Sequence, residues 1–288
     1  MPYLIGLVIA LFIALTGVGA GTVTVPVLVL FLHVPAPIAV GIGLTFSAVV
    51  KLILVPSQIA RRNVAWPTLG LMLLGGVPGV LIGSFFLKQL VTAGSQNLMN
   101  GLLGAILVST ASWQILFSFR PMREKSGAEQ RGYLLPWLML PVGAEVGFSS
   151  AGAGALGSAA LLSFTSLIPV QVVGTDIVFG FILSVIGSGA HWFSHPLSEP
   201  LLLQLTAGGL AGAVGGTLFA HRIPRRPLRL ALWVWLLVLG GQLIFNSYKG
   251  WATPHKDTVG AVSSGMAHHR SPYPIQLPGG GPSPIPSP

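Results

Sequence analysis

The sequence predicts an all-α, polytopic membrane protein, on the basis of its composition, its long apolar runs and an internal repeat. Of 288 residues, 52% are hydrophobic and 7% are charged, and the mean hydropathy is +0.79. A soluble domain carries roughly 25% charged residues, whereas a run of about 20 apolar residues crosses a bilayer. Cysteine is absent, so there is no disulfide framework and no thiolate chemistry. Lipid is therefore the expected surrounding of most of this chain.

About eight hydrophobic segments follow one another along the chain. Six have the length of a single crossing: 37–58, 66–88, 98–117, 170–192, 201–220 and 228–245. The other two, 3–33 and 133–167, are each about 30 residues long, more than one upright helix needs. Glycines interrupt both of them, in GVGAG (17–21) and SAGAG (150–154). The polar stretch 249–288, rich in Pro, Gly and Ser, predicts a disordered tail.

An internal repeat relates the two halves at a constant offset of 133 residues, with no gap. At this offset LGGVPGVLIGSFF (74–86) falls on AGGLAGAVGGTLF (207–219), with four glycines and one phenylalanine identical. The predicted organisation is a first transmembrane repeat (1–119), a cytoplasmic basic linker (120–132), a second transmembrane repeat (133–248) and the tail (249–288). Each repeat contains four hydrophobic segments.

Loop charge predicts that the two repeats have opposite orientations in the membrane. Short loops rich in Lys and Arg stay in the cytoplasm, and the basic loop 59–66 corresponds to 193–200, which has no Lys or Arg. Conversely, 88–97 with one lysine corresponds to 221–230 with four arginines. Inverted repeats require this flip if the first segment of each is a re-entrant pair of half-helices; two long, kinked helices are the alternative. Because topology explains the basic loops and the net charge of +9, no nucleic-acid partner is expected.

The two glycine breaks predict a substrate-binding site. Irregular backbone is tolerated at membrane depth only where it is buried in protein or lines a cavity. A half-helix that begins there presents unpaired N–H groups and about half a positive charge, which attract an anion. Close helix packing by small residues is the competing interpretation. The residues expected at the site, with Ser158 as a further donor, are Thr16, Gly17, Gly19, Gly21, Thr22, Thr24, Ser149, Ser150, Gly152 and Gly154.

Ionisable residues inside predicted spans are candidates for function, because each costs roughly 2.5–3.5 kcal/mol to bury in a bilayer. Lys51 is expected either to balance the charge of a bound anion, or to form a structural salt bridge or snorkel. Asp176 and Glu145 are candidates for a proton-linked gate. His191, at the end of a span, is expected to form hydrogen bonds rather than bind a metal. No cofactor and no metal site are predicted.

Catalytic motifs are absent from the sequence. It contains no His-Glu-x-x-His pair, no Gly-x-Ser-x-Gly elbow and no cysteine, so an enzyme is not expected. A transporter for a small anion fits the glycine breaks. A permease or channel for a different solute, either a cation or a neutral organic molecule, is the alternative, and it would use carbonyl groups at the breaks. The sequence gives no indication of the oligomeric state.

Several motifs resemble the TauE/SafE family of sulfite exporters: GVGAGTVTVPVL, RRNVAW, VVGTDIVFGFILSVIGSGAH and GTLFAHRIPRRPLR. The resemblance covers roughly 3–247, and its most specific part is Gly174-Thr175-Asp176 with Gly187 and His191. It implies a multi-pass protein of the cytoplasmic membrane that exports small sulfur-containing anions such as sulfite and sulfonates. It also adds Thr175 and Asp176 to the expected binding residues. Alternating access is expected to come from one repeat rocking against the other.

Overall fold

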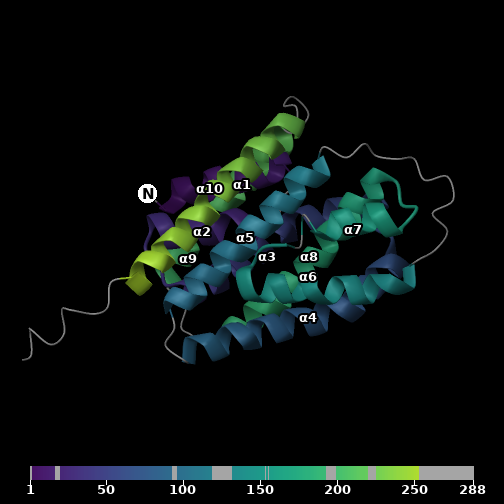
Figure 1. The fold of residues 1–288 in the computed structure, drawn as a ribbon. Helices are drawn as coiled ribbons and strands as arrows, with labels where there is room; N and C mark the ends of the chain where they lie inside the picture. The colour runs from purple at the N-terminus through teal and green to yellow at the C-terminus, as the bar shows by residue number, and fades with distance from the viewer. Residues whose placement is uncertain are drawn as a thin grey trace, which may run out of the picture. The chain divides into compact units, whose positions relative to one another are not determined.

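A computed structural model confirms the all-helical class, because every regular element among the described residues is a helix (Figure 1). The structure describes residues 2–16, 20–92, 96–118, 132–152, 154, 156–192, 199–219 and 225–252. The helices are α1 (Pro2–Thr16), α2 (Ala20–Phe31), α3 (Ala36–Ala60), α4 (Trp66–Thr92), α5 (Gln96–Ser118), η1 (Gly132–Leu134), α6 (Leu135–Ser149), α7 (Leu156–Phe164), α8 (Pro169–Trp192), α9 (Glu199–Phe219) and α10 (Arg225–Ala252).

The helices match the hydrophobic segments, and both long segments are broken as predicted. Segment 3–33 forms α1 and α2, and segment 133–167 forms α6 and α7. Five helices are long and apolar enough to cross a bilayer within the described residues: α3, α4, and parts of α5, α8 and α10 that span at least 20 residues each. The compact unit that contains them is Met1–Lys249. The predicted tail and the linker 120–131 lie outside the described residues, apart from the end of α10.

The helix boundaries repeat at the offset found in the sequence. α1 and α6, α3 and α8, and α4 and α9 each start 133 residues apart. The most extensive helix contacts follow the same rule, because α4 packs on α6 and α9 packs on α1. In both interfaces the fourth helix of one half therefore covers the first helix of the other half.

Glycines bring α4 and α6 into backbone contact. A Cβ atom added at Gly75 would overlap the carbonyl oxygen of Pro136, and one added at Gly79 would overlap that of Leu140. Figure 1 shows α6 lying along α4. In a bilayer, where water does not drive helices together, close packing of small residues is a main source of association. These glycines therefore hold the two helices together.

The α1–α9 interface repeats this contact residue for residue. A Cβ at Gly208 would overlap the carbonyl oxygen of Tyr3, and one at Gly212 would overlap that of Leu7. Each of these four residues lies 133 positions from its counterpart in the α4–α6 interface. The small-residue packing that the sequence offered as an alternative role of glycine is thus present in α4 and α9.

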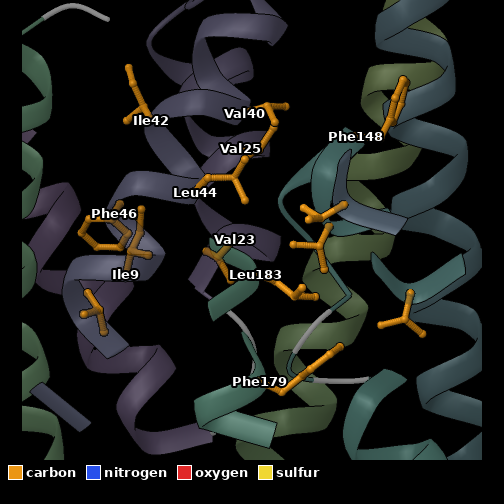
Figure 2. Close-up of a cluster of buried hydrophobic side chains, with 14 of the residues drawn as sticks. Ile9, Val23, Val25, Val40, Ile42, Leu44, Phe46, Phe148, Phe179 and Leu183 are labelled. Carbon is orange, nitrogen blue, oxygen red and sulfur yellow. The ribbon is translucent and has the colours of Figure 1, made fainter. Parts of the chain in front are cut away.

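The apolar core lies where α3 and α8 meet. Val40, Ile42, Leu44 and Phe46 of α3 and Leu183 of α8 are buried, together with valines of α2 (Figure 2). The outer surface is also apolar, with many exposed Leu, Val, Phe and Trp side chains. Such a surface suits a hydrocarbon surrounding. The hydrogen-bonded helices leave irregular backbone mainly at the breaks.

Substituting Gly79 tests the glycine packing. Gly79→Ala should lower the melting temperature, because overpacking costs typically 1–3 kcal/mol. Gly70→Ala on the same helix is the matched control, because a Cβ there meets nothing within 4 Å; it should be neutral or stabilising by about 0.5–1 kcal/mol. Thermal unfolding of the purified protein in detergent measures both. Equal melting temperatures for the two variants would contradict the backbone contact.

Candidate functional site

The second break is a short turn between α6 and α7 that contains two left-handed residues. Ser150 has φ 61° and Gly152 has φ 89°. The N–H of Ser150 still donates to the carbonyl of Val146, at 2.8 Å, while the N–H of Leu156 donates to that of Gly152, at 3.0 Å. A left-handed non-glycine residue costs about 1–2 kcal/mol. Ser150 is therefore held in a conformation that its own side chain disfavours.

The start of α2 lies directly against this turn. A Cβ added at Gly21 would overlap both the carbonyl oxygen and the Oγ of Ser150. One added at Gly43 of α3 would lie 3.2 Å from the same Oγ. The Ser150 side chain is only 6% exposed, and its Oγ has no hydrogen-bond partner among the described residues. An unsatisfied hydroxyl therefore lies at the first turn of α2.

Thr22 and Thr24 place two further hydroxyl side chains in this region, and both are fully buried. The first turn of α2 thus contains Gly21 and Thr22, with Thr24 just beyond. The structure brings together Gly21, Ser149, Ser150 and Gly152 from the set expected at the site. Gly17 and Gly19, and the side chain of Thr16, lie outside the described residues.

At the start of α7 the chain supplies its own carboxylate. The Oγ of Ser158 donates to Asp176 Oδ2 at 2.6 Å and lies 3.1 Å from the carbonyl oxygen of Gly154. A Cβ added at Gly157 would overlap Asp176 Oδ1, so the carboxyl group lies against the first turn of α7. A negative charge there stabilises a helix. The corresponding position beside α2 is Gly43, which has no side chain.

Lys51 is buried on α3 and interacts electrostatically with Asp176. This contact matches the structural interpretation of Lys51, in which a carboxylate balances the lysine. The role of Lys51 as a counter-charge for a bound anion stays a prediction. Both interpretations place a buried cation near the helix that carries the breaks' neighbour Gly43.

A polar seam, defined here as two facing stripes of α3 and α8, connects these groups. On α3 the stripe is Gly43, Ser47 and Lys51, and on α8 it is Asp176, Gly180, Ser184 and Ser188. Residues four apart lie on one face of a helix. Ser184 Oγ donates to Ser47 Oγ at 3.1 Å, and Thr45 Oγ1 lies 2.6 Å from Ser188 Oγ. Ser47, Gly43 and Ser184 were not predicted, although their spacing was visible in the sequence.

Two other predicted residues have structural partners. Thr175 Oγ1 accepts the N–H of Ala65 at 2.9 Å, which fixes the connection between α3 and α4. His191 Nε2 lies 3.1 Å from the carbonyl oxygen of Gly147 near the end of α6, as expected for a hydrogen-bonding residue. No group of three potential metal ligands occurs within the described ranges.

Glu145 lies behind the break, on α6. Thr110 of α5 donates to its Oε1 at 2.6 Å, and a Cβ added at Gly152 would lie 2.9 Å from its Oε2. Ser149 Oγ donates to the backbone carbonyl of Glu145 at 2.9 Å and accepts the N–H of Ala151 at 3.2 Å. Glu145 therefore contacts the turn from the side opposite α2's serine contact partner, the backbone of the break itself. Its partner Thr110 was not predicted.

Thr175→Val tests the structural role of this hydroxyl. The substitution keeps the shape but leaves the N–H of Ala65 without its acceptor, which costs about 1–3 kcal/mol for a buried donor. The melting temperature should fall, whereas Thr175→Ser should keep most of the stability. Unfolding curves of the three proteins in the same detergent measure the difference. Equal loss in the serine and valine variants would rule out the hydrogen bond as the cause.

Comparisons with known proteins agree with the sequence and the fold. The family model "Sulfite exporter TauE/SafE" matches residues 3–243. A protein of Bacillus subtilis (strain 168) described as "Probable membrane transporter protein YjnA" is 26% identical over 209 residues, which cover 70% of this chain and 82% of that protein. No solved structure matches the chain. The chain is a multi-pass membrane transporter and not an enzyme, and it belongs to the TauE/SafE sulfite exporter family.

Proposed function

We propose that this transporter moves small sulfur-containing anions, such as sulfite and sulfonates, out of the cell across the cytoplasmic membrane by alternating access. The observation that carries the proposal is the contact between Ser150 and the start of α2. A buried hydroxyl without a partner lies there against the positive end of a helix. An oxyanion is the ligand that such a pair of donors binds.

The first turn of α2 is the proposed centre of the anion site. Gly21, Thr22 and Thr24 would offer backbone N–H groups and hydroxyls, and Ser150 would add a donor from the other break. Thr16, Gly17 and Gly19 complete the site by their position in the sequence. Glycine at 21 and 43 allows the ligand and the second break to approach the backbone closely.

The start of α7 is proposed to have a different role. Because Asp176 already occupies it, a second anion there would meet a like charge. Asp176 and Lys51 instead form a fixed ion pair in the polar seam, or a pair that opens when the substrate arrives. In the second case Lys51 would turn from Asp176 toward the anion, as the counter-charge interpretation requires.

Inverted repeats are the proposed arrangement of the two halves. Contacts that recur with 133 added to one residue and subtracted from the other are typical of a two-fold relation. The flip of basic loops between halves favours an axis in the membrane plane. Under this proposal α1–α2 and α6–α7 are re-entrant pairs that enter and leave on the same side.

The moving bodies are proposed to combine helices of both repeats. Backbone contacts at glycines join α4 to α6 and α1 to α9, and each pair takes one helix from each half. Close-packed interfaces switch between discrete arrangements or stay rigid, and do not deform continuously. We therefore expect α4–α6 to rock against α1–α9, with the seam between α3 and α8 at the boundary, rather than one whole repeat against the other.

Export of an anion needs no coupling ion in an inside-negative cell. Each charge is worth roughly 2.3 kcal/mol per 100 mV, so a dianion gains about 4.6 kcal/mol on leaving. At about 1.4 kcal/mol per tenfold ratio, this supports an outward gradient of roughly a thousandfold. Uptake of the same anion would require protons or sodium.

Ser150→Gly separates binding from folding. Glycine suits the left-handed conformation, so the melting temperature should stay equal or rise. The concentration of sulfite at half-maximal flux should rise at least about tenfold, because a hydrogen bond to a charged group is worth about 1.5–3 kcal/mol. Flux of radiolabelled sulfite into proteoliposomes measures it, with the exposed Ser57→Ala as control. An unchanged half-saturation concentration would overturn the site, and saturable flux of a cation but not sulfite would overturn the substrate class.

Single cysteines test the orientation of the repeats, because the chain has none of its own. Arg62→Cys and His195→Cys occupy loop positions 133 residues apart. A membrane-impermeant maleimide should label the first from the cytoplasmic side and the second from the outside, in inside-out and right-side-out vesicles respectively. Labelling of both from one side would contradict the inversion.

A further inference from the structure

A second cavity lies away from the seam, between α4, α5, α6 and the start of α7. Its volume is about 560 Å³, within the range of about 300–1,000 Å³ typical of small-molecule sites. It opens on the apolar outer surface, because Ile82, Phe86 and Trp113 are each more than half exposed. A ligand would therefore enter from the hydrocarbon rather than from water. The lining is Ile82, Gly83, Phe86, Leu102, Ile106, Ser109, Thr110, Trp113, Pro141, Ala144, Glu145, Phe148 and Leu156.

The chemistry of this lateral cavity is opposite to that of the anion site. Its described lining has one carboxyl group, Glu145, and no lysine, arginine or histidine. Trp113 and the neighbouring rings of Phe86 and Phe148, whose centroids are 5.9 Å apart, add aromatic surface. Aromatic faces and a carboxylate both attract cations. Charge complementarity therefore favours an apolar molecule with one positive, hydrogen-donating group.

The fold itself does not require an acid at this position. The counterpart of Glu145 in the first half is Phe12, and that of Thr110 is Leu243. The same backbone therefore packs with apolar residues at both positions in the other half. A carboxyl group inside the membrane costs energy that this packing does not explain. The pair of Thr110 and Glu145 is a feature of one half only.

We propose that the lateral cavity binds a lipophilic amine from the bilayer, with its ammonium group at Glu145 and Thr110 and its apolar body against Phe86, Trp113 and Leu156. This site is separate from the anion site and does not depend on the proposed substrate. Its acid contacts the break, because Glu145 Oε2 lies 2.9 Å from the position of a Cβ at Gly152. An occupant would thus contact the turn from behind, through Glu145.

Cysteine protection tests the proposal on the full chain in lipid nanodiscs. Ser109→Cys places a thiol in the exposed part of the lining, and Ala105→Cys, one turn earlier on α5 and also exposed, is the matched control outside it. At about ten times its dissociation constant, decylamine should slow alkylation of Ser109→Cys by N-ethylmaleimide roughly tenfold. Alkylation of Ala105→Cys should not change. Decanol and decanoate share the tail and should protect less.

The head-group contact is tested by adding Glu145→Gln to Ser109→Cys. This double variant should need at least about tenfold more decylamine for the same protection, because the charge-assisted hydrogen bond is lost. Ile82→Trp, which fills the cavity from an exposed position, should remove protection even if the glutamine variant does not fold. Equal protection by the three compounds would mean that any acyl chain fills the cavity, and would overturn the proposal. Equal slowing at both cysteines, or no slowing, would also overturn it.

Discussion

The contact between Gly21 and Ser150 is the constraint on which the rest of this transporter depends. Irregular backbone inside a membrane must be covered by protein, because lipid offers it no hydrogen bonds. Here the start of α2 covers the turn between α6 and α7, and only a residue without a Cβ fits at position 21. Neither turn could exist at membrane depth alone. The two broken segments must therefore meet, and the remaining helices have to hold them in place.

The interfaces α4–α6 and α1–α9 do this by exchange between the halves. Each first helix, which ends at a break, is held by the fourth helix of the other repeat through backbone contacts at glycine. A single repeat would leave both faces without partners, so we expect neither half to form its break without the other. Duplication at a constant offset preserved these contacts, because each residue pair retains its counterpart. The glycines of α4 and α9 thus serve packing, whereas Gly21 and Gly43 serve the approach of the breaks.

The sequence predicted the parts of the fold that depend on local pattern. Hydrophobic length gave the segments, glycine clusters gave the two breaks, and the offset of 133 residues predicted which helices correspond. The side-chain partners depend on how helices cross, which one sequence does not contain. Asp176 was expected inside a span, but its position at the first turn of α7 follows from the placement of α8. The polar seam was readable from its spacing of four, whereas the pairing of Thr110 with Glu145 joins helices whose contact no pattern announces.

The symmetry of the backbone and the asymmetry of the side chains together explain how a weakly charged centre can select an anion. Lys51 and Asp176 balance each other within the seam, so they add no net charge. The selective element is then the uncompensated helix start at α2, worth about half a charge, together with the hydroxyl of Ser150. A carboxylate at position 43, equivalent to Asp176, would cancel that charge, and the chain has glycine there. Attraction by half a charge and a few hydroxyls is strong enough to recruit an anion and weak enough to release it, as transport requires.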